Sequence, residues 1–575
     1  MPPKRSASSS SKPSTSKPSK RIRSAFYGQI GASTAADDTA RLIASHHLAE
    51  HAGGGATYLA TRKDKQGVES LKEFSLQMAA QELYETIRLK DKDVRIPANS
   101  VGWDPNRDTT DQNQGIIAIK QFVERLPEET ANRLLSLVLY LSYQALQLPN
   151  DPGVSVLSIA SIFFHRISRL SLSSLSAPTV LLNRIPQCTE LVDLNLSHSA
   201  ALRDGVLSKI LAHLPFLEKI NLTACTKVGD ESVKAIALAS AQSLKSVNLS
   251  YTAVGSKGLA SLISRCASLE VLKLQAVGNL NEKMINQIVE TATNSPEGAM
   301  HIPLSNLKTL KLKNTLCTDA ALGRLLTLCS TTLTRLDVSY TQLKSLDIIS
   351  SALHTLPEWR LEKLVASGLP LTPPSLESFF RPLSERPDDE RNRFKILKLG
   401  SIPSTSTKAP GLTDAVLKKL LPYWETFEGL EKVSLYGNIY LAKTSEPMYS
   451  FLANIGSKLS YLNLTAIPVD SHHLEGLLEP VTFDENGNDH LCPAKLETLV
   501  LDSTRIDDKA AIPLSICKKL KALHVAETKI STTFLATLLR SCPDLSILNL
   551  TSCRGVPVTQ RRTFFDNWEK GEVEE

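Results

Sequence analysis

Hydrophobic residues recur along most of the chain in a six-residue pattern, L-x-x-L-x-L, with polar residues in the gaps. Copies begin at residues 167, 191, 217, 244, 269, 307, 333, 361, 394, 430, 459, 496, 520 and 545. Most copies start 24 to 29 residues after the previous one, and the longer spacings are 38, 33, 36 and 37 residues. Alternating apolar residues are typical of a short strand with one buried face. The pattern therefore predicts fourteen strands within residues 167–553.

Most of the spacers between these strands carry the apolar periodicity of an amphipathic helix. Each such helix is expected to begin at an N-cap residue with a side-chain oxygen: Asp204, Asp230, Ser256, Asp319, Asp414 and Ser531. A unit of this size cannot bury its apolar face alone, so neighbouring units must stack. The expected fold class is α/β, a curved solenoid of 13–14 strand–helix repeats with a parallel sheet on its concave face.

The nine cysteines fall mostly at two positions of this repeat. Cys225 and Cys553 follow the first leucine of their units by eight residues, where other units have Thr, Ser or Asn. A second group precedes the first leucine by three residues: Cys188, Cys266, Cys517 and Cys542. Both positions favour small side chains that pack or bond buried backbone. We therefore expect Cys225 to be a buried structural residue and not a nucleophile or a metal ligand.

Motifs for catalysis are missing from the sequence. It has no glycine-rich phosphate loop, no His-Glu-x-x-His and no paired Cys-x-x-Cys, so we expect no enzyme activity, no cofactor and no metal site. No apolar run reaches the roughly 18 residues of a membrane span, so no membrane association is expected.

The stretches LEKINLTACTKVGDESV (217–233) and CPDLSILNLTSC (542–553) resemble the cysteine-containing subfamily of leucine-rich repeats. The resemblance implies a fold similar to ribonuclease inhibitor. This subfamily is frequent in F-box substrate receptors of ubiquitin ligases and in related nuclear or mitotic-exit proteins. It therefore implies a non-enzymatic adaptor that captures a protein partner, with a stand-alone scaffold or inhibitor as the alternative.

Two helical segments are expected before the repeats. Residues 126–148 begin with Leu-Pro-Glu, as many F-boxes do, and continue with apolar residues at helical spacing. The segment 114–166 is therefore either a degenerate F-box-like unit, which would bind a Skp1/cullin or elongin adaptor, or a helical N-terminal cap of the solenoid. The segment 67–113 combines a helix over 70–89 with a polar linker over 91–113. Four apolar residues are expected on one side of that helix, which is either a partner-binding helix or part of the cap: Leu71, Phe74, Met78 and Ile87.

The N-terminal 66 residues are expected to be disordered, because they are rich in serine, proline and charge. Residues 1–24 carry seven basic and no acidic side chains, so the rest of the chain sums to −1 of the total +6. A nuclear-localisation signal is the favoured interpretation of this segment, and its candidate residues are six of the seven: Lys4, Arg5, Lys17, Lys20, Arg21 and Arg23. A solvated tail and a nucleic-acid contact are the alternatives. The expected location is the nucleus, with the cytoplasm as a second one.

In L-x-X-L-X-L-X the capitalised positions project from the concave face. Cations outnumber acids there, and the predicted partner-binding residues are Lys219, Lys273, Lys311, Lys313, Arg335, Lys363, Lys398, Lys432, Tyr436 and Tyr461. The acidic residues at these positions are Asp193, Asp337 and Asp502. We expect this face to bind an acidic protein segment. The alternatives are a solvated lysine-rich face and, less favoured because aromatic platforms are sparse, a nucleic-acid site. The protein is expected to be monomeric outside its complex.

Long spacers should form loops on one rim, at 293–303, 384–392, 401–410 and 480–490. The segment 554–575 is expected to be a C-terminal cap with an acidic tail, in which Phe564, Phe565 and Trp568 close the last core face.

Overall fold

The computed structural model describes residues 59–61, 71–94, 109–146, 159, 162–164, 167–173, 179–200, 202–294, 303–329, 331–402, 411–478, 481–483, 489–491, 494–557, 559–561 and 564–565. Fourteen three-residue strands of this part run parallel in one sheet, in chain order. They are β2 (Arg169–Ser171), β3 (Asp193–Asn195), β4 (Lys219–Asn221), β5 (Ser246–Asn248), β6 (Val271–Lys273), β7 (Thr309–Lys311), β8 (Arg335–Asp337), β9 (Lys363–Val365), β10 (Ile396–Lys398), β11 (Lys432–Ser434), β12 (Tyr461–Asn463), β15 (Thr498–Val500), β16 (Ala522–His524) and β17 (Ile547–Asn549). Each lies inside one copy of L-x-x-L-x-L, so the predicted array is confirmed.

Helices connect successive strands and cover the outer side of the sheet. The longer ones are α7 (Asp204–Leu211), α8 (Asp230–Ala239), α9 (Ser256–Arg265), α10 (Glu282–Asn294), α11 (Asp319–Cys329), α12 (Asp347–His354), α13 (Pro373–Ser384), α15 (Asp414–Trp424), α16 (Ser445–Asn454) and α19 (Thr532–Ser541). Short helical turns complete other units: α6 (Thr179–Leu182), η1 (Ile185–Gln187), α14 (Asp388–Arg391), η2 (Gly456–Lys458), α17 (Ser471–Leu474), η3 (Glu475–Leu478), η4 (Asp508–Ala510) and α18 (Ala511–Leu514).

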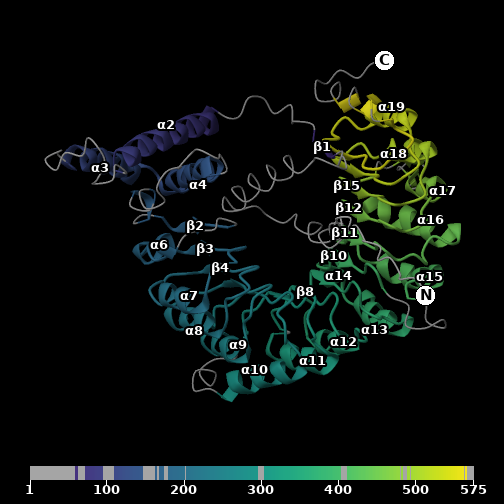
Figure 1. Cartoon of the computed structure of the whole chain (residues 1–575). Helices are drawn as coiled ribbons and strands as arrows, with labels where there is room; N and C mark the ends of the chain where they lie inside the picture. The colour runs from purple at the N-terminus through teal and green to yellow at the C-terminus, as the bar shows by residue number, and fades with distance from the viewer. Residues whose placement is uncertain are drawn as a thin grey trace, which may run out of the picture.

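The result is a horseshoe with the sheet on the inside and the helices on the outside (Figure 1). The leucine pattern explains it, because the apolar residues of each unit point away from the concave face into the layer between sheet and helices. In the β4 unit, Leu217, Ile220 and Leu222 are at most 3% exposed. Stacking joins these layers into one hydrophobic core that continues from α2 (Leu71–Val94) to Phe565.

The predicted N-caps are wrong for most of the aspartates. Asp204 is the first helical residue of α7, and its carboxylate instead accepts the Glu231 and Ser232 N–H groups of the next helix, at 3.0 and 2.9 Å. Asp230 does the same for the Gly255 and Gly258 N–H groups, at 2.7 and 2.9 Å. The aspartates therefore join neighbouring units, which a pattern within one unit cannot reveal.

Two further aspartates also bond the following unit, whereas other residues cap their own helices. Asp319 accepts the Lys344 N–H, and Asp414 accepts three N–H groups of the following unit. Thr413 is the N-cap of α15, and Ser256 is the first helical residue of α9 after a glycine N-cap. Ser531 caps α19 as predicted, because its hydroxyl accepts the Thr533 N–H.

Among the elements that the structure describes in full, three helices precede the repeats: α2, α3 (Thr109–Arg125) and α4 (Glu128–Leu146). Helix α4 packs between α2 and the first strand β2, with Leu134, Leu135 and Val138 at most 2% exposed. This packing closes the first core face, so α4 is a cap whatever else it binds. Helix α2 continues to Val94 and α3 begins at Thr109, so helices extend into both ends of the predicted linker.

The buried side of α2 differs from the predicted one. Ala80, Leu83, Tyr84 and Ile87 are at most 8% exposed, whereas Met78 is 57% exposed. The apolar spacing placed Met78 with Ile87, but the contact with α4 lies nearer the middle and end of the helix.

The last strand, β17, does not leave an open edge or an open core behind it. Residues 59–61 form β1 (Leu59–Thr61), which pairs antiparallel with β17, so this part of the predicted disordered segment is a strand. Near the C-terminal end of the repeats, Phe565 is 9% exposed and Phe564 is partly buried against the hydrophobic core, as expected of a C-terminal cap. Trp568 and the remainder of residues 1–66 lie outside the described residues.

Two of the predicted loops are ordered instead. The stretch 384–392 contains α14, whose Glu390 accepts the Trp359 N–H at 3.0 Å and pairs with Arg386 at 3.0 Å. The stretch 480–490 contains most of a hairpin of β13 (Val481–Phe483) and β14 (Asp489–Leu491). Residues 295–302 and 403–410 are outside the described part.

Candidate functional site on the concave face

The third residue of each strand is the key position on the concave face. In five strands it is asparagine: Asn195, Asn221, Asn248, Asn463 and Asn549. Each side-chain oxygen accepts the backbone N–H two residues further on, at 2.9–3.2 Å. Asp337 of β8 makes the same bond to the Ser339 N–H, at 3.1 Å. In six of the fourteen described parallel strands, this position therefore satisfies a backbone N–H where the strand ends.

Three strands have lysine at this position: Lys273 in β6, Lys311 in the adjacent β7, and Lys398 in β10, three strands further along the sheet. Lysine has no acceptor atom, so it cannot make the bond that asparagine makes. In two of these units a serine of the preceding unit accepts that N–H instead: Ser250 accepts the Gln275 N–H at 3.3 Å, and Ser367 accepts the Gly400 N–H at 3.0 Å. The lysine side chain therefore does not perform this structural task and places a cation on the concave face. A departure from the local rule without structural benefit is the expected sign of a functional position.

Lys363 completes the basic cluster from the first position of β9, beside Arg335 in β8. Burial and the charges of Lys398 and Lys311 lower the pKa of Lys363 to about 8, although Asp337 acts in the opposite sense. Burial also lowers the pKa of Lys398. Within the described part of the chain, neither amine lies within 4.0 Å of a carboxylate, whereas Arg335 pairs with Glu362 at 3.5 Å.

A pair of tyrosines crosses the concave face next to this cluster. The Tyr340 and Tyr436 hydroxyls lie 2.7 Å apart, although the residues belong to the β8 and β11 units. Each ring lies over a glycine of the intervening units, because a Cβ at Gly368 would overlap Tyr340 and one at Gly400 would overlap Tyr436. Burial and the hydrogen bond with Tyr340 raise the pKa of Tyr436.

Cations stack on the aromatic rings at both sides of this bridge. The Lys313 amine lies 5.7 Å from the ring centre of Tyr340, and the Lys398 amine lies 5.7 Å from that of Tyr461. Such cation–π contacts hold the lysine chains over the sheet. The site is therefore an ordered arrangement of cations and aromatic rings.

The structure brings nine of the ten predicted residues together on the adjacent strands β6 to β12, namely Lys273, Lys311, Lys313, Arg335, Lys363, Lys398, Lys432, Tyr436 and Tyr461. Lys219 is separate, because β4 lies two strands before β6. Tyr340 was missed, since it follows the last position expected to face inward. The two glycines opposite the tyrosines were the available signal, as most other units have larger residues there. The basic N-terminal residues lie outside the described residues.

Beyond β12 the concave face carries acidic residues and histidine instead of the lysine cluster. Burial raises the pKa of Asp502 to about 6, although its carboxylate accepts the Ala526 N–H at 2.7 Å. Burial lowers the pKa of His524 on β16. Glu527 accepts the Ser503 hydroxyl at 2.8 Å. The strongly basic surface is thus confined to the middle of the horseshoe.

The described cysteines are buried, as predicted for Cys225. The Cys225 thiol is 0% exposed and donates to the Leu196 carbonyl of the preceding unit, at 3.1 Å between sulfur and oxygen. Cys553 makes the same contact with Val525 at 3.0 Å. Burial raises the pKa of Cys266, at the end of α9, to about 12. These thiols are therefore structural, and Cys492 lies outside the described residues.

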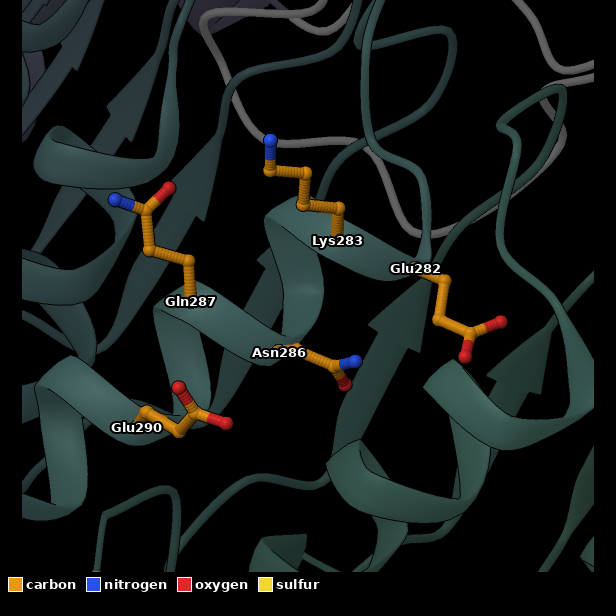
Figure 2. A pocket seen from close by; sticks show the side chains of 5 residues that line it. All are labelled: Glu282, Lys283, Asn286, Gln287 and Glu290. Carbon is orange, nitrogen blue, oxygen red and sulfur yellow. The ribbon is translucent and has the colours of Figure 1, made fainter.

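A hollow on the outer side of the horseshoe offers no comparable chemistry. Figure 2 shows its polar side chains along α10, among them Glu282, Lys283 and Glu290. Both carboxylates are already engaged by the next unit. Glu282 accepts the Thr318 hydroxyl at 2.7 Å, and Glu290 pairs with Arg324 at 3.0 Å. In the described part of the chain, no three His, Cys, Asp or Glu side chains converge as metal ligands would, and no helix could cross a membrane.

Comparison with known proteins agrees with the repeat. A family model described as leucine-rich repeat matches residues 213–237 and 240–262, which include the β4 and β5 units. The described chain has the fold of a leucine-rich-repeat solenoid. No curated protein sequence matches it.

Two solved structures are similar to this chain at low sequence identity. The complex of Rad7 and Elc1 from yeast matches with 14% identity and a TM-score of 0.44, over 86% of this chain and 96% of that one. An internalin from Listeria monocytogenes matches with 16% identity and a TM-score of 0.35, over 69% of this chain and 91% of that one.

Proposed function

We propose that the protein is a non-enzymatic adaptor whose concave face, from β6 to β12, binds an acidic segment of a partner protein. The observation that carries this proposal is the replacement of a backbone-bonding asparagine by Lys273, Lys311 and Lys398 in the middle of the horseshoe. Complementary charge would speed docking and fix the register of an extended segment. The aromatic rings beside the lysines would give it apolar contacts.

An array of acidic, neutral and basic nonamer peptides, probed with the purified full chain, tests this proposal. Acidic peptides should bind selectively, and Lys311→Glu with Lys313→Glu should abolish that binding. Lys257→Glu with Lys283→Glu, on exposed positions of α9 and α10, changes the net charge equally on the outer side. Equal loss in both double variants, or no selective binding to acidic peptides, would contradict the proposal.

We infer further that the adaptor serves as the substrate receptor of a cullin-type ubiquitin ligase, with its N-terminal helices docking a Skp1-like or elongin-like subunit. The supporting observation is a pair of exposed apolar side chains on α3, where Ile117 is 50% and Phe122 is 53% exposed. On the same helix Val123 is 1% exposed, so α3 keeps apolar residues on both its inner and its outer side. A cap alone requires only the inner side.

Binding of purified ligase subunits to the full chain tests the proposed role as a substrate receptor. Skp1 and the elongin B–C pair are each titrated against the full chain, and one of them should bind. Ile117→Asp with Phe122→Asp should remove that binding, whereas Gln121→Asp, at an exposed position of the same helix, should leave most of it. Absence of binding to either subunit leaves the stand-alone scaffold as the function.

We also propose a nuclear location, which rests on the seven basic residues within 1–24. A fluorescent fusion that lacks residues 1–24 should move from the nucleus to the cytoplasm. A truncated fusion that stays nuclear would remove this assignment.

A further inference from the structure

The most unusual cluster of charges on the concave face consists of the amines of Lys311, Lys363 and Lys398. They come from β7, β9 and β10, so the three residues span four adjacent strands, or roughly 14 Å at the usual strand spacing. All three are partly buried. In the described part of the chain, none of the three lies within 4.0 Å of a carboxylate. Long lysine side chains can converge from such positions, because each reaches about 6 Å from its backbone.

Asp337 is the acidic residue among them, and it is already engaged by the Ser339 N–H. Counting three ammonium groups against one carboxylate leaves a net charge of two at this point. A single carboxylate on a partner would neutralise only half of that charge. A phosphorylated side chain carries about −1.5 to −2 at neutral pH, so it matches the cluster more closely.

The hydrogen-bonded pair of Tyr340 and Tyr436 borders this cluster of lysines on the concave face. Tyr340 and Tyr436 share one hydrogen bond between their hydroxyls, so one hydroxyl proton of the pair is not used between them. Gly368 and Gly400 are needed for the two rings to lie in this position. Four residues of different units are therefore matched to build a feature that a repeat does not require.

We propose that Lys311, Lys363 and Lys398 form a subsite for a phosphorylated serine or threonine of the protein that the concave face binds. This subsite rests on the proposed function, since it places one residue of the bound acidic segment. Three point-like ammonium donors suit the oxygens of a phosphate, which accept hydrogen bonds from several directions. The tyrosine pair borders the phosphate and limits the approach of the segment to one side.

Binding of a phosphate should be coupled to the proton on Lys363. Several groups face this amine: Lys311 from β7, Arg335 and Asp337 from β8, and Lys398 from β10. Together with burial they lower its pKa to about 8. A bound dianion favours the charged amine, so affinity should fall as the pH rises from 7 to 9. Lys363→Arg keeps its charge over this range and should lose most of the dependence.

The experiment uses the full chain and a set of acidic nonamer peptides in three forms, with a central serine, glutamate or phosphoserine. Affinity is measured by fluorescence anisotropy at pH 7 and at pH 9. We expect the phosphoserine form to bind at least about tenfold more tightly than the glutamate form at pH 7. Lys311→Asn with Lys398→Asn should remove this preference, and Lys257→Asn, at an exposed lysine of α9 on the outer side, should keep it.

The outcomes separate this inference from the proposed function. Equal binding of phosphoserine and glutamate forms would overturn the phosphate subsite and leave the acidic-segment site intact. Failure of all three forms to bind would overturn both. A single-stranded oligonucleotide that binds as tightly as the phosphopeptide, with the same dependence on Lys311 and Lys398, would also overturn the inference, because the cluster would then recognise nucleic-acid phosphates.

Discussion

The β3, β4 and β5 units and the units of β6, β7 and β10 share one backbone, yet they use the third strand residue differently. In the first group Asn195, Asn221 and Asn248 bond the chain as it leaves the strand. In the second group lysines stand there. The N-terminal group satisfies the strand exit from within its own unit. In the β6 and β10 units of the central group, a serine of the preceding unit does so, and the third strand residue is a lysine on the concave surface.

The outer layer differs between the same two regions. The N-terminal units fill it with aliphatic residues and cysteine, whereas the central units pack aromatic rings between α12 and α16. Those central units are also long, with spacings of 33 and 36 residues before the β10 and β11 units. Longer units leave more space between sheet and helices, and large rings fill it. The aromatic core thus lies around the β9 to β11 units, of which the β10 unit carries a lysine at the third strand position.

Truncation of the aromatic core should have the largest effect on stability. Phe379 is 0% exposed, and its ring centre lies 5.1–6.4 Å from those of His354, Trp359, Phe380 and Phe394. Phe379→Ala should lower the free energy of unfolding by about 3–5 kcal/mol, because it removes buried contacts and leaves a cavity. Denaturant melts measure the loss, and hydrogen exchange should locate it.

The matched N-terminal change is Cys266→Ala, which removes one buried atom and should cost about 1 kcal/mol. Because repeats interact chiefly with their neighbours, faster exchange after Phe379→Ala should be confined to the central units. Exchange that rises equally in β3 and β4 would show that the two regions unfold as one.

Removal of an aspartate that bonds the backbone of the next unit should have the next largest effect on stability. Asp414 is 7% exposed and accepts the N–H groups of Ala442, Lys443 and Thr444 at 2.7–2.8 Å. Asp414→Ala leaves these donors without a partner and should cost about 2–3 kcal/mol in thermal or denaturant unfolding. Asp204→Ala removes a more exposed joint with two N–H donors and should cost about half as much. An equal loss at both sites would mean that burial adds nothing to the joint.

The sequence pattern predicted the strands accurately because each leucine has a fixed place in the core. It could not assign Asp204 and Asp230, since a residue at a unit boundary may cap its own helix or the next one, and both partners are equally near in the pattern. The pairing of β1 with β17 joins residues 59–61 to residues 547–549, and three residues carry no signal for so distant a partner. The lysines were visible in the sequence, but the bridge of Tyr340 and Tyr436 depends on two units between them.

The charged cluster should lower stability, as expected of a site kept for binding. The pKa of Lys363 is lowered to about 8 in the folded chain, whereas an unfolded lysine titrates near ~10.4. The unfolded chain therefore holds more protons between these values, so the contribution of Lys363 becomes less unfavourable as the pH rises from 8 to 10.4. At pH 7 its unfavourable effect is present in full.

Lys363→Met should accordingly stabilise the protein at pH 7 by about 1–2 kcal/mol, after allowance for solvent screening. The advantage should shrink by pH 10, and unfolding at both pH values measures it. Lys432→Met, at an exposed position, should change stability by less than about 0.5 kcal/mol at pH 7. A destabilised Lys363→Met variant at pH 7 would contradict the view that this lysine opposes folding.

An exchange of residues between the two regions gives the smallest stability effect and the sharpest comparison. Asn221 accepts the Thr223 N–H at 3.1 Å and the Thr223 hydroxyl at 2.7 Å, so Asn221→Lys should cost about 1 kcal/mol. Lys311→Asn restores the residue that the repeat favours and should change stability by no more than about 0.5 kcal/mol. The double variant keeps composition and net charge, and it moves one cation three strands along the sheet, or roughly 14 Å. If binding of acidic peptides depends on total charge, the double variant binds as the original does. A site built around the position of Lys311 predicts that binding is lost and that Asn221→Lys does not restore it.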